Sequence, residues 1–380
     1  MKIKAYKLED EHFGNQFHDE AEDHWEYNDY ISHPSWRNGW ISFDSIYHNQ
    51  PDDRLYLGIT SFNADIFRAF DRSSGSFVDL GYNRIAHPQD AKFHRSLVKW
   101  EKDGALYAAI ALLHDIDRYW DAPGGAIVRY DPVTGELAKV GIPLPHVYIQ
   151  SICIDQKRGM LYGQTFTPER MVSFDLNTHQ SRDLGPIGCG FVLAQGENIE
   201  LDDEDCVWCG WSVTRAWQSG AGVDANRLCK YDPGTDKILY MDTGLPKPDG
   251  NYGYEKTEGL FNLREGRFYA SGANGSLYRL DTRTGQCTYI CTPIPDRPSR
   301  LASLKLGPDG AAYGVTGRAG RCEVLRFDLD AEKYTLLGPV TDGTDSCWQV
   351  HDVAVTSDGV LYACENDNPY RSGYLWEIRL

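Results

Sequence analysis

One short phrase recurs along this chain: a turn residue followed by three residues, the last of which is aromatic. It occurs seven times, and its aromatic residues are Tyr56, Tyr107, Tyr162, Trp208, Tyr269, Tyr313 and Tyr362. These positions lie 51, 55, 46, 61, 44 and 49 residues apart. That period is typical of a propeller blade, in which four strands are joined by loops of variable length.

A second phrase, an apolar residue followed by aspartate and a turn, comes after each of the first six copies. It reads Phe70-Asp71, Tyr130-Asp131, Phe174-Asp175, Tyr231-Asp232, Leu280-Asp281 and Phe327-Asp328. An aspartate that opens a turn accepts hydrogen bonds from backbone N–H groups, and a glycine later in the turn supplies positive φ. The second phrase therefore predicts the turn between the third and fourth strands of a blade.

The seventh copy has no fourth strand after it. The alternating segment at residues 2–8 can supply that strand beside the C-terminal segment at residues 373–380. Such pairing would close the ring and remove an open sheet edge. We therefore expect an all-β fold, a seven-bladed β-propeller closed by its N-terminal strand, as one domain over residues 1–380.

Charge and hydropathy restrict the partners. The 38 basic and 55 acidic residues give a net charge of −17, which disfavours binding to a phosphate backbone. No apolar run is long enough to span a membrane, and the N-terminus lacks the apolar segment of a secretory signal. We expect no nucleic-acid or membrane partner. We expect a cytoplasmic location if this N-terminus is native, and a secreted or periplasmic one if a signal peptide has been removed.

The ten cysteines have no disulfide-framework spacing, so we expect reduced thiols. The pair Cys206 and Cys209 has the spacing of a zinc knuckle, but it lies within a strand phrase and has no second pair of that spacing. We interpret these two as structural thiols. The sequence does not predict the oligomeric state.

The expected b→c and d→a loops are long and open on one face, where a site is expected. His94 precedes the inner strand of blade two and His114 follows its neighbour, so the two can meet at the mouth of the ring. Tyr148 begins the next inner strand. The other candidates on this face are Gln164, Arg170, Arg215, Arg300, Arg318, Gln349 and His351, with the aromatic residues Trp36, Trp211, Trp217, Trp348 and Tyr370.

With these residues in view, the chain resembles the seven-bladed propeller polysaccharide lyases, which include ulvan lyases and rhamnose–glucuronate lyases. The likeness is most specific at Lys92-Phe93-His94, at His114, at residues 148–155 and at residues 161–164. In those families, two histidines on one blade and a tyrosine on the next serve the uronate. The resemblance implies these roles for His94, His114 and Tyr148. It also implies an arginine near position 164, where this chain has Gln164, so the task would pass to Arg170 or Arg215.

The predicted reaction is β-elimination of a uronate-containing glycan, with an acidic oligo- or polysaccharide as substrate. Removing the C5 proton of a uronate requires its carboxylate to be neutralised and a general base to be positioned. We assign Tyr148 as base or acid, His114 as its partner and His94 as the carboxylate ligand. Trp36, Trp211 and Trp217 are predicted to stack on sugar rings, and Arg318 and His351 to bind substrate.

Three alternatives stay open. A metal-dependent propeller hydrolase or lactonase would use carboxylates and amides such as Glu258, Asp352 and Asn366. An oligogalacturonate-lyase-type enzyme would use histidines with glutamine, for which Gln349 and His351 are candidates. A non-catalytic carbohydrate-binding propeller would need only the aromatic loops. The lyase hypothesis requires no cofactor, whereas the metal-dependent alternatives would use a divalent cation such as Ca²⁺, Zn²⁺ or Mn²⁺.

Overall fold

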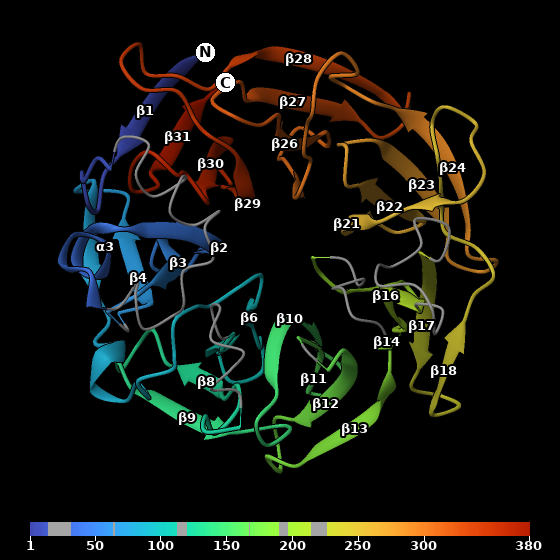
Figure 1. Ribbon diagram of the computed structural model, residues 1–380, viewed down its shortest axis with the longest axis horizontal. Helices are drawn as coiled ribbons and strands as arrows, with labels where there is room; N and C mark the ends of the chain where they lie inside the picture. Colours follow the sequence, from blue (N-terminus) through green and yellow to red (C-terminus); the bar gives the residue numbers. More distant parts are fainter. Residues whose placement is uncertain (14–31, 64, 112–119, 167, 190–196, 214–225) are drawn as a thin grey trace.

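The computed structural model describes residues 1–13, 32–63, 65–111, 120–166, 168–189, 197–213 and 226–380. Seven of the sheets formed by its described strands are arranged as blades in a ring (Figure 1), which confirms the predicted seven-bladed β-propeller. That residues 1–380 make one domain stays a prediction.

Each blade has four antiparallel strands, and the fourth blade has one more. The innermost strands face the axis of the ring, where they line a cavity of about 240 Å³ that we call the central channel. The first three blades are β2 (Ile41–Asn49), β3 (Arg54–Ser61), β4 (Phe67–Asp71) and β5 (Ser76–Asp79); β6 (Leu97–Lys99), β7 (Leu106–Ala109), β8 (Ile127–Tyr130) and β9 (Leu137–Gly141); and β10 (Tyr148–Asp155), β11 (Met160–Phe166), β12 (Arg170–Asp175) and β13 (Ser181–Pro186). The fourth is β15 (Glu200–Leu201), β16 (Val207–Val213), β17 (Arg227–Asp232) and β18 (Lys237–Tyr240), with β14 (Gly188–Cys189) added beside β16.

The last three blades complete the ring. They are β21 (Thr257–Arg264), β22 (Arg267–Gly272), β23 (Leu277–Asp281) and β24 (Gln286–Cys291); β25 (Leu304–Leu306), β26 (Ala312–Thr316), β27 (Glu323–Asp328) and β28 (Lys333–Pro339); and β29 (Val350–Val355), β30 (Val360–Glu365), β31 (Leu375–Arg379) and β1 (Lys2–Tyr6). Outside the blades, the short elements are the hairpin β19 (Leu245–Pro246) and β20 (Tyr254–Glu255), the helix α3 (Pro34–Gly39) and the 3₁₀ turn η1 (Tyr82–Arg84).

The ring closes as predicted. β1 pairs antiparallel with β31, from Lys2 opposite Arg379 to Tyr6 opposite Leu375. The two ends of the chain therefore lie together in one blade (Figure 1), and the seventh sheet has no missing strand. Packing between blades adds to this closure, since one hydrophobic cluster joins Phe43 and Leu57 of blade one to Tyr362 and Leu375 of blade seven.

The repeated aspartates accept the backbone hydrogen bonds that the turn prediction requires. Asp131 Oδ1 accepts hydrogen bonds from the backbone N–H groups of Val133 and Thr134, at 2.9 and 3.2 Å. The same pair of bonds forms at the other five copies: Asp71, Asp175, Asp232, Asp281 and Asp328. Local sequence thus determines both the turn and the strands that it joins.

The cysteines whose side chains the structure describes are free thiols, as expected. Within the described ranges, none of the helices has the length and apolar character needed to cross a lipid bilayer.

Candidate functional site

One residue from each blade lies at one mouth of the channel, at or just before the start of the inner strand. Each precedes the aromatic residue of the following strand by 11 to 13 positions. Six of the seven are ionisable. Packing between blades needs apolar side chains, so this concentration of ionisable groups points to a binding or catalytic site. In blade order these residues are Asp44, His94, Gln150, Glu197, Glu258, Arg300 and His351.

β-Bulges place four of these residues. In blade one, Phe43 pairs with Ile59 and Ser45 with Gly58, so Asp44 is an extra residue without a partner in the ladder. The same irregularity falls at Gln150, Glu258 and His351. A bulge bends the strand and re-aims the extra side chain. The other three residues, His94, Glu197 and Arg300, lie in the segments that enter β6, β15 and β25.

The closest group at this mouth joins His94, Glu197 and His351, from blades two, four and seven. Nε2 of His94 lies 3.1 Å from Oε2 of Glu197, and Nε2 of His351 lies 3.4 Å from the same oxygen. The two imidazole rings meet edge to face, with their centroids 4.3 Å apart. Three side chains that are far apart in sequence therefore point one atom each at a common place. We call these three residues the His–Glu–His cluster.

Backbone carbonyls decide which ring nitrogen carries hydrogen. Nδ1 of His94 is 2.9 Å from the carbonyl oxygen of Gln150, and Nδ1 of His351 is 2.9 Å from that of Asp44. Because a carbonyl only accepts, each Nδ1 is the donor. In a neutral imidazole, Nε2 then carries a lone pair. Two nitrogen lone pairs and a carboxylate oxygen consequently face one another.

Burial favours that neutral form. It lowers the pKa of His94 to about 4, with the charge of Lys92 adding to the effect, and it lowers the pKa of His351 well below its ordinary value. Burial raises the pKa of Glu197, and the nearby positive charge of Arg300 opposes that rise. Near pH 7 the cluster is two neutral histidines and one carboxylate, an arrangement that a cation stabilises.

The donor set suits a divalent transition metal. Ligand atoms that neighbour each other around such an ion lie roughly 3.0–3.4 Å apart when each bond is about 2.1 Å. Two imidazoles with one carboxylate occur in catalytic zinc and non-haem iron sites, where further positions stay open for water or substrate. The carbonyl acceptors at both Nδ1 atoms are the outer contacts that metal-binding histidines require. Imidazole nitrogens favour Zn²⁺ over Ca²⁺, whose ligands are oxygens.

Two buried arginines adjoin the cluster. Arg300 donates from Nε to Oε1 of Glu258 at 2.5 Å, and its Nη2 lies 3.8 Å from Oε2 of Glu197. Arg95 donates from Nη1 to the carbonyl oxygen of Glu258 at 3.1 Å and lines a cavity of about 240 Å³ in the channel. Guanidinium groups bind carboxylates through paired N–H donors. An anionic group that reached the cluster would therefore meet positive charge beside it.

Asp44 supports the cluster from behind. Its carboxylate is fully buried, accepts a hydrogen bond from the Thr60 hydroxyl and lies 3.7 Å from Nζ of Lys92. Its Oδ1 is also 3.3 Å from Nδ1 of His351. Burial raises the pKa of Asp44 to about 7 against the opposing charge of Lys92. This carboxylate therefore helps to hold the imidazole of His351 in place.

The structure brings together two predicted site residues, His94 and His351, which the sequence analysis had given separate roles. His114 lies outside the described residues, so its predicted pairing with His94 stays a prediction. Tyr148 begins β10, and its fully buried ring packs in a hydrophobic cluster with Phe93 and Ile110. Its catalytic role also stays a prediction.

The predicted sugar platforms are placed differently from the expectation. Trp211 lies in strand β16 rather than in a loop, and its Nε1 donates to the carbonyl oxygen of Leu228 at 3.0 Å. Trp36 lies in the short helix α3, with 0% of its surface exposed and its ring stacked on His33. A fully buried ring presents no face to a sugar, so Trp36 is a packing residue in this structure. Trp217 and Arg215 lie outside the described residues.

The remaining candidates divide between outer strands and the mouth. Gln164 is buried in β11, and Arg170, at the start of β12, forms an ion pair with Asp183 of β13 at 2.7 Å. This ion pair commits Arg170 to an outer strand of its own blade rather than to the channel mouth. Arg318 does reach the mouth, where its Nε donates to Oε1 of Gln349 at 3.1 Å. Of the residues considered for a hydrolase, Glu258 belongs to the mouth, bound to Arg300.

Sequence reasoning missed Glu197, Gln150 and Asp44. Glu197 follows a long loop and has no motif of its own, and Asp44 looks like an ordinary strand residue. Counting back 11 to 13 residues from each repeated aromatic position would have found all three, because the blades repeat in space as well as in sequence. A separate cavity of about 890 Å³ lies over blades four to six and is lined by Lys247, Tyr289 and Arg297. It lacks the convergent acceptor atoms that distinguish the cluster.

No family model matches the chain, and no curated protein matches it by sequence. Among solved structures, the chain is similar to the WD40 repeats of RRP9, with a TM-score of 0.60 and 10% identity over 91% of this chain and 96% of the other. It is also similar to the extracellular domain of BT4673 from B. thetaiotaomicron, with a TM-score of 0.59 and 10% identity over 89% of this chain. The match spans only 38% of that longer chain.

A weaker likeness is to a structure named as a gluconolactonase, with a TM-score of 0.46 and 15% identity over 75% of this chain and 87% of the other. It carries no functional argument. At such low identities the first two likenesses show the propeller fold and nothing about the site.

Proposed function

We propose that this protein is a metal-dependent enzyme that cleaves a uronate-containing glycan by β-elimination. The observation that carries the proposal is the convergence of His94 Nε2, His351 Nε2 and Glu197 Oε2 at the mouth of the channel. These acceptors favour a bound cation, and Arg300 adds a second positive charge beside it. A carboxylated sugar is the ligand class that this combination recognises.

The chemistry explains why positive charge is needed. In β-elimination the C5 proton of the uronate goes to a base, the C5–H electron pair becomes the C4=C5 double bond, and the C4–O bond breaks. The leaving oxygen then takes a proton. The C5 proton is weakly acidic until the neighbouring carboxylate is neutralised. When bound, a divalent ion would supply that neutralisation as a Lewis acid. We assign the proton transfers to His114, because the ring of Tyr148 is fully buried.

A second candidate is a metal-dependent hydrolase or lactonase. The specific observation in its favour is the same donor set, because two histidines and one glutamate also serve metal sites that activate water. The two functions differ in product. Elimination leaves a conjugated double bond that absorbs ultraviolet light, whereas hydrolysis leaves none.

The test begins with metal binding. Protein stripped with a chelator would be titrated with Zn²⁺, Mn²⁺ and Ca²⁺ by calorimetry, beside Glu197→Gln and the matched control Glu200→Gln. Glu200 lies three residues further along and lines the channel cavity, but it is not a member of the cluster. We expect one ion to bind the wild type and Glu200→Gln, with Zn²⁺ bound more tightly than Ca²⁺. We expect Glu197→Gln to lose about 100-fold or more in affinity.

Activity is measured next, as ultraviolet absorbance on a panel of uronate-containing glycans. A rise that requires metal and disappears in Glu197→Gln supports metal-dependent elimination. New reducing ends without a rise favour the hydrolase. A rise that survives both chelation and Glu197→Gln contradicts the proposed role of the cluster.

A further inference from the structure

We infer that the mouth of the channel holds a second subsite, beside the His–Glu–His cluster, that takes a neutral sugar ring linked to the uronate. This inference rests on the proposed function, because the cluster is where the uronate would lie. The subsite consists of the aromatic pair Trp348 and Tyr370 with the polar residues Arg318, Gln349 and Asp367.

The aromatic pair can contact a ligand. The rings of Trp348 and Tyr370 lie edge to face with centroids 5.1 Å apart, and 38% of the surface of Tyr370 is exposed. Trp348 is half-buried. Aromatic faces that stay in contact with water are the side chains on which the apolar face of a pyranose packs. Trp36 is fully buried and lacks this property.

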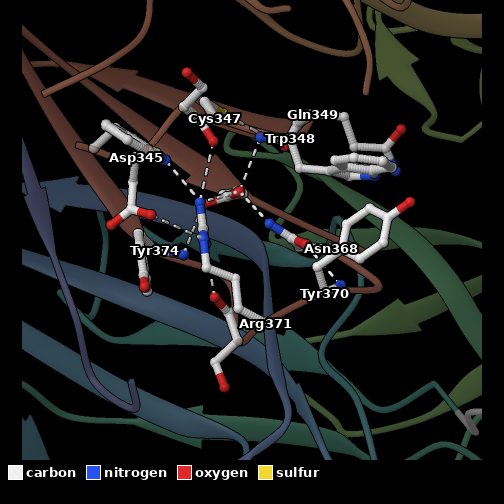
Figure 2. A network of polar contacts seen from close by, with 12 residues as sticks. Asp345, Cys347, Trp348, Gln349, Asn368, Tyr370, Arg371 and Tyr374 are labelled. Atoms are coloured by element: carbon white, nitrogen blue, oxygen red, sulfur yellow. Dashed lines mark hydrogen bonds and ion pairs between the residues drawn. The ribbon is translucent and has the colours of Figure 1, made fainter. Parts of the chain in front are cut away.

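A buried ion-pair network fixes the backbone on which both rings stand, as Figure 2 shows. Glu365 accepts the backbone N–H of Trp348 at 2.8 Å and both terminal nitrogens of Arg371, the residue after Tyr370, at 3.0 and 2.9 Å. Asn368 connects the two sides, since its Nδ2 donates to Glu365 and its Oδ1 accepts the N–H of Tyr370. In Figure 2 the two rings lie at the edge of this network, on the side away from Asp345. Rigid support of this kind pre-organises a binding surface.

Polar groups continue from the rings toward the cluster. Gln349 follows Trp348, accepts from Arg318 Nε at 3.1 Å and donates to Asp367 Oδ2 at 3.4 Å. His351 of the cluster is two residues further along, in β29. Asp367 is held in the left-handed region, with φ of 47°, by a hydrogen bond from its N–H to Ser42 Oγ at 3.0 Å.

The charges indicate which sugar fits. Arg318 and Asp367 are exposed, carry opposite charges and flank one neutral amide, so the polar set is neutral overall. Donors and acceptors in that balance suit hydroxyl groups, whereas a second carboxylate would meet Asp367. Deeper in the channel, Arg300 and Arg95 balance Glu197 and Glu258, so a divalent cation bound at the cluster would leave positive charge there for a carboxylate. We therefore assign the uronate to the cluster and a neutral pyranose to the aromatic pair.

Calorimetry on zinc-loaded protein tests this assignment with three probes. They are glucuronate, a β-1,3-linked glucuronate–glucose disaccharide and a β-1,3-linked diglucuronate. None of the uronates in these probes has a sugar at C4, so elimination does not consume them. We expect the wild type to bind the glucuronate–glucose probe about tenfold more tightly than glucuronate, and to gain less from diglucuronate.

The variants Trp348→Ala, Tyr370→Ala and Arg318→Ala should each lose most of that gain while glucuronate affinity stays unchanged. Trp120→Ala and Tyr252→Ala are matched controls, because these rings are 73% and 82% exposed on other blades. Thermal midpoints confirm folding, and Arg318→Ala changes only an exposed side chain. Equal binding of glucuronate and the glucose disaccharide by the wild type overturns the subsite. A gain that survives all three variants overturns it as well.

The two proposals fail separately. If metal binding and elimination hold but the disaccharide brings no gain, the subsite alone is wrong. If the tenfold gain depends on Trp348 while chelation leaves activity unchanged, the metal-dependent function is wrong and the subsite stands.

Discussion

Two enclosed glutamates at the same end of this propeller have opposite surroundings. Glu365 receives six N–H donors, from Trp348, Asn368, Arg371, Tyr374 and Trp376, all between 2.8 and 3.0 Å (Figure 2). Glu197 faces two imidazole nitrogens whose hydrogens point elsewhere, receives one long hydrogen bond from Gln150 Nε2 at 3.5 Å, and has its nearest guanidinium nitrogen 3.8 Å away. The first carboxylate is neutralised by a full set of donors, whereas the second has few donors among the described residues, so a bound cation would complete its neutralisation.

The different surroundings of the two glutamates indicate different roles, one in stabilising the fold and one in binding. A buried charge with a full set of donors stabilises one arrangement of loops, and its removal leaves the partners uncompensated. A carboxylate placed among acceptors costs stability unless something binds, and such sites persist where binding is their purpose. Glu365 lies beneath Trp348 and Tyr370, and Glu197 belongs to the His–Glu–His cluster. Substituting each glutamate in turn therefore tests whether the first stabilises the fold and the second serves binding.

The largest expected effect concerns stability. Glu365→Gln should lower the free energy of unfolding by about 3–5 kcal/mol, because Arg371 loses its counter-ion in a buried setting. Glu197→Gln, measured without metal, should change it little or raise it, because the amide can donate to an imidazole Nε2. Urea unfolding in the presence of a chelator measures both. Equal losses in the two variants would break the comparison.

An intermediate effect is expected at Asp44, which contacts the His–Glu–His cluster only through His351. Asp44→Asn should weaken Zn²⁺ binding by about 10-fold to 100-fold, since outer contacts orient metal-binding histidines. Calorimetric titration with Zn²⁺ measures the change, and the urea midpoint of the metal-free variant reports whether the channel is intact. Unchanged affinity in a folded variant would show that Asp44 does not position His351.

The smallest effect is expected at the exposed turns, where carboxylates accept backbone hydrogen bonds without burial. Hydrogen bonds from Thr134 and Val133 lower the pKa of Asp131 below its ordinary value of 3.8. The stabilisation is therefore present above about pH 4 and is lost as the pH falls through the lowered pKa. Asp131→Ala should reduce the thermal midpoint by about 1–2 °C at pH 7. Below the lowered pKa of Asp131 the variant and the wild type should converge. A difference that persists in acid would point to a cause other than the carboxylate.

Much of the fold could be predicted because the residues that determine it lie close together in the sequence. The aspartates of the second phrase form their turns with residues two and three positions away, and the aromatic phrases place the second strand of each blade. The pairing of residues 2–8 with the C-terminal segment was a long-range prediction, and β1 beside β31 confirms it. Its success depended on counting strands, because a blade with three strands leaves a sheet edge that the chain ends can complete.

The candidate site could be predicted only in part. His94 and His351 were singled out by residue type and by their place before or within inner strands, but nothing local relates them to Glu197. Of the rings predicted to bind sugars, Trp211 lies in strand β16 rather than in a loop, and Trp36 is fully buried, because burial and strand membership depend on how neighbouring blades pack. Trp348 and Tyr370 stand out only once their exposure and their support by Glu365 are known.

The sequence by itself determined the number of blades, the turns between their outer strands and the closure of the ring, because each depends on short repeated phrases or on strand count. Only the tertiary structure decided which residues meet at the mouth. His94, Glu197 and His351 belong to three different blades, and the bend of a bulged strand aims His351 at the other two. That meeting follows from the closed ring and from bulges in its inner strands, and neither the distance nor the direction is encoded in any one segment of the chain.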